Sequence, residues 1–412
     1  MRVFLFVCLS QALLCTVVFG HHEKEEEHHG ENADEHAMET PLQKIVPGNV
    51  KFAYSLYSHL AEEYPNDNLF FSPMSISTLF SMLSVGARGP TQTQIYEGLG
   101  FNMSAISEED INKGFQQQIH ALNHRTSDLE LSSANALFVE QHAKLLEKFS
   151  EDLKNFYEAE AISTDFTNGD EAKNQINSYV EKKTNGKIKD LLSSVGPQTL
   201  LVLINTIHFK GTWLHAFDET RTHESDFHVD ENTVVKVPMM TIREEFLIAI
   251  ERESGCVVVD IPYKGNTSAI LILPDKGKLH EVEKAVQNVS LQTWAKRMRP
   301  MKILLSIPKF CVSATLNLKN ELPKLGIKDV FSGIADLSGI TGDRLQVSEA
   351  IHKAVLSVDE KGAEAAGASA AAITKLSMPF HFNADRPFLI TLLHKPTDTI
   401  LFTGRVVKPE KC

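Results

Sequence analysis

The sequence predicts an α+β fold, because helical and strand patterns alternate irregularly along the chain. Apolar residues between positions 49 and 63 recur at helical spacing, at Phe52, Leu56 and Leu60. Residues 200–209 form an almost continuous apolar run, which is typical of a strand covered on both faces. Residues 351–360 have a clear strand pattern as well.

The first twenty residues carry one basic side chain, Arg2, followed by an apolar run. The run is too short and too close to the N-terminus for a good membrane-spanning helix, and a strongly polar stretch follows it. Val18 and Gly20 supply the small residues expected before a cleavage site. We therefore predict that residues 1–20 are a signal peptide and that the mature protein is soluble and secreted.

Residues 21–46 begin with an acidic stretch that contains five histidines. The histidines could bind a metal, but they lack a ligand spacing tied to a fold, so we predict a disordered acidic tail, no metal site and no cofactor. The remaining length suits one large domain or several average ones. The formal net charge of −12 argues against nucleic acid or an anionic membrane as a partner.

Ser72 and Pro73 mark the start of a further predicted helix, as its N-cap and its first residue. The glycine-rich stretch 86–101 lacks the Gly-Lys-Ser/Thr ending of a phosphate-binding loop, so we expect a turn between helices there. Across the chain, no Gly-x-Ser-x-Gly elbow, His-Glu-x-x-His motif or paired-cysteine zinc spacing occurs. The sequence therefore predicts that the protein is not an enzyme.

Three cysteines follow the predicted signal peptide, and an odd number leaves at least one thiol free. Cys256 and Cys311 lie among apolar residues, so both are expected to be buried structural thiols. Cys412 ends the chain and is expected to be exposed and open to mixed disulfides.

Residues 362–372 contain no side chain larger than serine except Glu364. Their composition fits an alanine-rich helix or a flexible linker, and by itself favours the linker. With a period of two, Ala363, Ala365 and Gly367 share one face, which is small enough to enter a crowded sheet. Glu364 lies on the opposite face and would remain in water.

The segments that flank this stretch resemble the serpin family, and most closely its alpha-1-antitrypsin branch. Strand 351–360 precedes it, and Phe382-Asn-Ala-Asp-Arg-Pro-Phe-Leu-Ile-Thr-Leu392 is similar to the C-terminal signature of the family. The resemblance runs from about residue 47 to the end, which implies a single serpin domain over 47–412. It also implies a large mixed central β-sheet with further sheets, surrounding helices and an exposed reactive-centre loop at about 360–380.

The resemblance assigns three groups of residues to the opening of the sheet. The hinge of the loop corresponds to Glu360, Gly362, Ala363, Ala365, Ala366, Gly367 and Ala368. The shutter beneath the sheet corresponds to Ser72, Ser75, Asn205 and His352, which would form either a breakable or a static polar network. The breach at the top of the sheet corresponds to Trp213, Lys309 and Glu360, with Lys309 expected to pair with Glu360.

The family mechanism implies a function as a suicide substrate of a serine protease. Leu376 lies 16 residues after Glu360, the usual family spacing for the residue before the cleaved bond, and Ser377 follows it. Leucine suits chymotrypsin- or elastase-like pockets, whereas Lys375 leaves a trypsin-like cut one bond earlier open. The expected partner is an extracellular protease of the former kind, held covalently by a monomeric inhibitor. The alternative is a non-inhibitory serpin that carries a small hydrophobic hormone.

Asn102, Asn266 and Asn288 each begin an Asn-x-Ser/Thr sequon, the acceptor signal for glycosylation of a secreted protein. Asn102 and Asn266 fall where antitrypsin-like serpins also carry sequons. We therefore expect a glycoprotein, with these two sites ranked above Asn288.

Overall fold

The computed structural model describes residues 39–123, 129–288, 291–342, 345–361 and 379–411, and the fold is that of these residues. The helices are α1 (Pro41–Glu63), α2 (Pro73–Ser84), α3 (Gly89–Gly98), α4 (Glu108–Asn123), α5 (Glu147–Tyr157), α6 (Gly169–Lys183), α7 (Leu279–Asn288), α8 (Leu291–Arg297), α9 (Leu318–Glu321) and α10 (Ser338–Thr341). None of these helices has the length and apolar character needed to cross a membrane.

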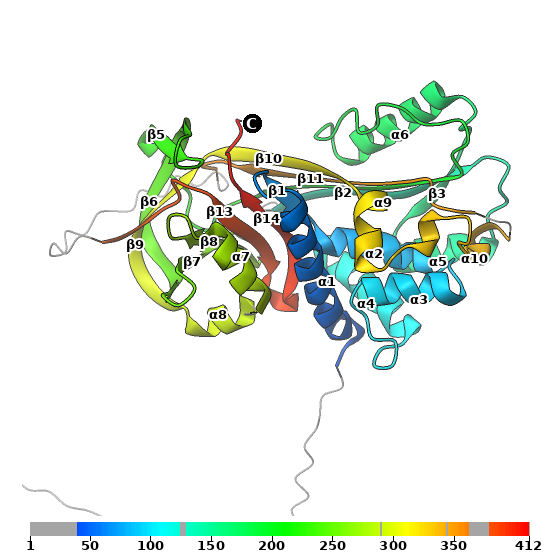
Figure 1. The fold of residues 1–412 in the computed structure, drawn as a ribbon, viewed down its shortest axis with the longest axis horizontal. Helices are drawn as coiled ribbons and strands as arrows, with labels where there is room; N and C mark the ends of the chain where they lie inside the picture. Colours follow the sequence, from blue (N-terminus) through cyan, green and yellow to red (C-terminus); the bar gives the residue numbers. More distant parts are fainter. Residues whose placement is uncertain (1–38, 124–128, 289–290, 343–344, 362–378, 412) are drawn as a thin grey trace, which may run out of the picture. The chain divides into compact units, whose positions relative to one another are not determined.

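The five-stranded sheet is mixed, with both parallel and antiparallel neighbours (Figure 1). In spatial order its strands are β10 (Phe310–Asn317), β11 (Glu349–Val358), β4 (Leu201–Gly211), β2 (Leu129–Glu140) and β3 (Glu160–Thr164). The strands predicted over 200–209 and 351–360 are thus confirmed as β4 and β11, and they lie side by side in the middle of this sheet.

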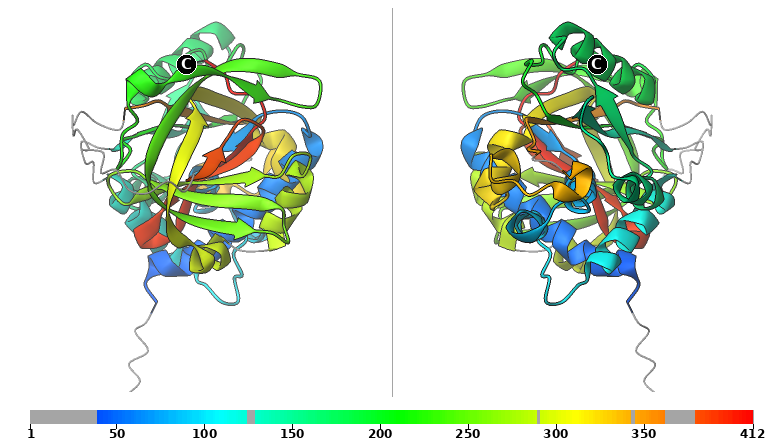
Figure 2. Two further views of the ribbon diagram at one scale, coloured as in Figure 1. Left: turned by 90° about the vertical axis from the view of Figure 1, so that its left-hand side faces the viewer. Right: turned by 90° about the vertical axis from the view of Figure 1, so that its right-hand side faces the viewer.

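The second sheet joins segments that are far apart in the sequence (Figure 2). Its main path is β1 (Leu69–Phe71), β14 (Thr399–Val406), β13 (Phe388–His394), β8 (Thr267–Pro274), β7 (Cys256–Pro262), β6 (Val234–Glu251), β9 (Arg299–Pro308) and β12 (Phe380–Asn383), with β5 (His223–His228) paired to β6. The C-terminal signature, residues 382–392, supplies most of the largely buried strand β13.

The alternation of side chains along β4 explains the layers of the core. Val202 and Ile204 face α6, which covers one side of the five-stranded sheet (Figure 1). Leu203 faces the opposite side and packs in the cluster formed by the α1–α5 helices. Ile207 and Phe209 share that side further along the strand, but they pack against the second sheet. The sheet is therefore covered on both faces, as the continuous apolar run of β4 indicated.

Helix α1 begins at Pro41, eight residues before the helical pattern noted at 49–63, and it includes the last six residues of the predicted tail over 21–46. Thr40 and Gln43 form a capping box, and Pro41 occupies the first turn, where its missing N–H is not needed. These interactions start the helix ahead of Pro47, which lies inside it. The prediction of Ser72 as the N-cap of α2 is confirmed, because its side chain accepts from Ser75 N at 3.2 Å.

The prediction of a turn over 86–101 is wrong for most of that stretch, because residues 89–98 form α3. Pro90 lies in the first turn of the helix, where proline is tolerated, and Gly100 follows the helix with a φ of 84°. The glycines therefore mark the two ends of a helix rather than a continuous turn.

The prediction for Cys311 is also wrong. Cys256 is a buried free thiol, as expected, and burial raises its pKa to about 12. Cys311 is half-buried and disulfide-bonded, and its partner lies outside the described residues. Its backbone N–H also donates to the carbonyl of Glu410 at 2.9 Å, so the C-terminal segment lies along β10. The apolar residues that flank Cys311 in the chain carry no sign of this pairing across the fold.

Candidate functional site

The centre of the five-stranded sheet is a parallel pair, β4 and β11, flanked on each side by an antiparallel neighbour. The two strands are in register from Val202 opposite Glu349 to Phe209 opposite Leu356. A chain that entered between them in the opposite direction would form an antiparallel ladder with both. An inserted strand would therefore have an antiparallel partner on both sides at this pair.

A row of polar side chains crosses the sheet at this pair. His352 on β11 lies opposite Asn205 on β4, and Asn205 lies opposite Asn135 on β2. His352 Nδ1 bonds to Asn205 Oδ1, and Asn205 Nδ2 donates to Asn135 Oδ1. Separating β4 from β11 would break the first of these bonds and leave the second in place.

The start of α2 completes this polar network from below. Ser72 N donates to His352 Nε2 at 3.1 Å, and Asn205 Nδ2 donates to the carbonyl of Ser75 at 3.3 Å. His352 thus accepts at Nε2 and donates at Nδ1, which is the pattern of a neutral imidazole. The structure brings all four predicted shutter residues together. Asn135 was missed, because only the strand register places it beside Asn205.

Burial lowers the pKa of His352 to about 3, whereas an unfolded histidine titrates near about 6.5. Below about pH 6.5 the unfolded chain binds a proton that the folded protein does not, so stability falls as the pH drops towards 3. We expect His352 to lower the free energy of unfolding by on the order of 2 kcal/mol between about pH 6.5 and pH 5. Urea unfolding of wild type and His352→Gln at both pH values checks this, because the variant should lose that share of the pH dependence. If the free energy of unfolding changed equally with pH in the two proteins, this prediction would be contradicted.

Trp213 lies at the end of β4 and β11, where β11 leads into the small-residue stretch. Its Nε1 donates to the carbonyl of Asp359 at 2.9 Å, and its ring stacks on Tyr263 with 4.0 Å between the ring centroids. The side chain of Asp359 forms an ion pair with Lys210 at 3.0 Å. Trp213 is therefore a buried core residue that also holds the end of β11 in place through its hydrogen bond. Sequence reasoning named Trp213 but missed Lys210 and Asp359 as an ion pair.

The Glu360 carboxylate is almost fully buried beside this anchor. Lys309 Nζ donates to Glu360 Oε2 at 2.6 Å, and Thr222 Oγ1 donates to Glu360 Oε1 at 2.8 Å. Burial alone would raise the pKa of Glu360, but the hydrogen bonds from Lys309, from its own backbone N–H and from Thr222 hold that pKa below its ordinary value. The same contact with Glu360 raises the pKa of Lys309. Both groups are therefore charged at neutral pH, and they tie β11 to the strand that begins at Phe310.

Of the loop predicted at about 360–380, residues 362–378 lie outside the described part of the chain. This applies to the hinge residues other than Glu360 and to Leu376 and Ser377. Among the predicted sequons, Asn102 and Asn266 are exposed, whereas Asn288 ends α7 and the rest of its sequon is not described. No cluster of His, Cys, Asp or Glu suited to a metal ion occurs among the described residues.

The family model described as Serpin (serine protease inhibitor) matches residues 47–409. The chain belongs to the serpin family. Among its relatives, an alpha-1-antitrypsin-like protein of Tamias sibiricus is 47% identical over 367 residues, which cover 89% of each chain. Alpha-1-antiproteinase 2 of Equus caballus is 45% identical over 386 residues, covering 93% of this chain and 92% of the relative. The predicted family is therefore confirmed.

A solved structure agrees with the fold as well. Human thyroxine-binding globulin, crystallised with its hormone, is 40% identical and superimposes with a TM-score of 0.84 over 90% of this serpin and all of the solved chain. The serpin fold predicted from the sequence is thus confirmed. The relatives include both proteins named as antiproteinases and a protein named for a hormone, so the family alone does not choose between these activities.

Proposed function

We propose that this serpin is a secreted suicide substrate of a chymotrypsin- or elastase-like serine protease. The protease serine attacks the carbonyl carbon of Leu376 and forms an acyl-enzyme, while the amine of Ser377 leaves with a proton. The freed segment from about Gly362 onwards then enters the sheet between β4 and β11. The attached protease is carried along, and the ester is trapped before water can cleave it.

The observation that carries this proposal is the parallel pair of β4 and β11. The small-residue stretch follows β11 directly in the sequence, so after cleavage it can fold back antiparallel to β11 and also to β4. Each new ladder hydrogen bond contributes about 1 kcal/mol net, so a strand bonded on both sides adds on the order of 10 kcal/mol. That gain would drive the insertion.

In this proposal the two polar sites have separate tasks. The network of Ser72, Ser75, Asn205 and His352 holds the middle of β4 against β11, and it must open for the new strand. Lys309 and Glu360 hold the end at which the strand enters. The segment 1–20 directs secretion, residues 21–38 form an acidic tail, and Asn102, Asn266 and Asn288 are the proposed glycosylation sites.

Incubation with chymotrypsin or elastase tests the proposed function. We expect a band on a denaturing gel near the summed masses of inhibitor and protease, because the ester bond survives detergent. Mass spectrometry of the released C-terminal fragment should find Ser377 at its start. A parallel incubation with trypsin checks the neighbouring bond, because trypsin would cut after Lys375 and leave Leu376 at the start of the fragment. Clean cleavage without a covalent band would refute the inhibitory mechanism.

The second candidate function, carriage of a small hydrophobic hormone, is favoured by the similarity to thyroxine-binding globulin. Equilibrium dialysis against thyroxine and a steroid, before and after loop cleavage, distinguishes the two. A protein that binds the hormone and forms no covalent complex with any protease in the panel would be a carrier.

A further inference from the structure

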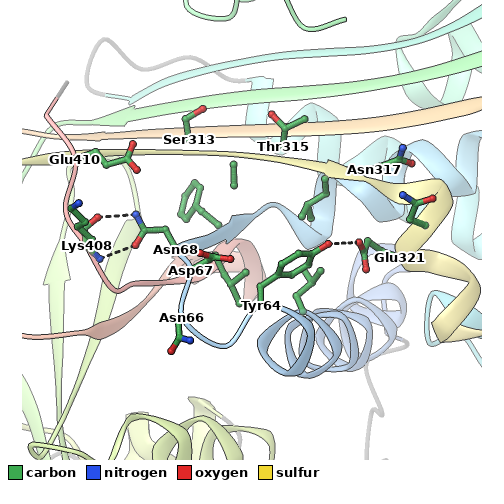
Figure 3. A pocket seen from close by; sticks show the side chains of 16 residues that line it. Tyr64, Asn66, Asp67, Asn68, Ser313, Thr315, Asn317, Glu321, Lys408 and Glu410 are labelled. Carbon is green, nitrogen blue, oxygen red and sulfur yellow. Dashed lines mark hydrogen bonds between the residues drawn. The ribbon is translucent and has the colours of Figure 1, made fainter. Parts of the chain in front are cut away.

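A hollow of about 570 Å³ lies beside the outer edge of the five-stranded sheet, at β10, which is the strand next to β11 (Figure 3). It is bounded by β10 on one side and by the turn between α1 and β1 on the other. Its volume falls within the range of about 300–1,000 Å³ that is common for ligand sites. None of the predicted hinge, breach or shutter residues lines it.

One wall of the hollow is the free edge of β10. The N–H of Cys311 points outward, since it donates to the carbonyl of Glu410. Backbone groups alternate in direction along an antiparallel strand, so those of Ser313 and Thr315 also point outward, towards the hollow. Within the described residues no other segment of the chain pairs with this edge beyond Cys311. The C-terminal segment therefore pairs with only the first part of this edge, and a guest bound in the hollow could pair with the rest.

The side chains around the hollow favour an extended guest with alternating residues. Ala314 and Leu316 lie between the outward-facing residues and form an apolar floor, with the fully buried Leu60 and Phe70 behind them. A strand added to β10 would place every second side chain against this floor and the others towards solvent. The edge from 313 to 317 is long enough for about five residues, or roughly 16 Å.

The charges around the hollow are mostly negative. Asp67, Glu321 and Glu410 line it, against one cation, Lys408. Glu321 is engaged by His59 at 2.7 Å and by Tyr64 at 3.0 Å. The carboxylates of Asp67 and Glu410 have no ion-pair partner among the described residues. A guest with lysine or arginine side chains would complement this excess of negative charge.

We propose that the hollow binds a short, extended, basic segment of a partner protein, which adds as a strand to the outer edge of β10. Main-chain hydrogen bonds to Ser313 and Thr315 give the affinity. The apolar floor selects alternate side chains, and Asp67 and Glu410 select the positive charges between them. This site is separate from the reactive bond, so binding does not depend on the proposed inhibitory function.

The probe is a fluorescent peptide, acetyl-Lys-Val-Lys-Val-Lys-amide, with binding to the full mature protein measured by fluorescence anisotropy. Ser313→Pro removes one outward N–H that the ladder with β11 does not use, and proline is tolerated at such edge positions. Ser313→Ala keeps that N–H and is the matched control. We expect about fivefold weaker binding for Ser313→Pro and unchanged binding for Ser313→Ala, since a lost hydrogen bond costs about 1 kcal/mol.

Further arms test the charge and the identity of the occupant. Asp67→Asn should weaken binding, and the same peptide with glutamate in place of lysine should not bind. Equal binding by Ser313→Pro and wild type, provided both unfold at the same temperature, would overturn the proposal. So would an absence of saturation up to about 1 mM peptide. Spermidine binding as tightly as the peptide would show a site for small cations, and self-association abolished by Ser313→Pro would show a second copy as occupant; either result overturns the proposal.

Discussion

Ala363→Arg is expected to convert the proposed inhibitor into a substrate. Ala363 lies on the small-residue face that must enter the crowded sheet, and an unpaired charge buried there costs several kcal/mol. The chemistry at Leu376 is unaffected, because the protease attacks before insertion. We expect the initial rate of cleavage to stay at the wild-type value, whereas the covalent band disappears and the protease recovers its full activity.

Ala366→Arg is the matched control, because Ala366 shares the opposite face with Glu364. It introduces the same side chain three positions away and should keep most of the inhibition. The stoichiometry of inhibition, measured for both variants and wild type against the same protease, separates the two faces. If Ala363→Arg inhibits as well as wild type, insertion does not bury this face.

Glu360→Lys is expected to yield polymers during refolding. The substitution replaces a buried, hydrogen-bonded carboxylate with a second cation beside Lys309. The new ammonium group would stand in a site that is buried in the wild type, without a carboxylate to pair with, and an unpaired buried charge costs several kcal/mol. The end of β11 would then close slowly during folding, and the exposed strand edges could accept the small-residue stretch of another molecule.

Size-exclusion chromatography of freshly refolded protein measures this effect. Polymer should be abundant in Glu360→Lys, rare in wild type, and reduced again when Lys309→Glu is added to restore opposite charges. Thr222 would remain as a hydrogen-bonding neighbour in every sample. A double variant that polymerises as much as Glu360→Lys would mean that Lys309 and Glu360 do not act as a pair.

The sequence predicted the elements that depend on local pattern. The apolar run of β4, the N-cap of α2 and the C-terminal signature led to correct elements, because burial and capping leave a period or a residue type in the sequence. Helix α3 was missed, since its few buried residues, Thr91, Ile95 and Tyr96, leave a weak helical pattern among glycines. The start of α1 was missed because a capping box precedes Pro47.

The candidate site could be predicted only as far as the family resemblance named its residues. The burial of Glu360 is a tertiary property, and a lysine–glutamate pair known only from sequence would be ranked as an exposed one worth about 0–1 kcal/mol. Thr222 and Asn135 join the site from other elements through register and loop path. The disulfide of Cys311 and the hollow beside β10 likewise depend on which distant segments meet.

The parallel pair at the centre of the sheet has a consequence for how the stability of this serpin is to be understood. If one more strand lowers the free energy, the described five-stranded arrangement is not the state of lowest free energy. It persists because a kinetic barrier separates it from the more stable form. The quantity that matters is then a lifetime, set by how often β4 and β11 part. An apparent melting temperature would depend on the heating rate, and a residue that slows the parting would prolong activity without changing any equilibrium constant.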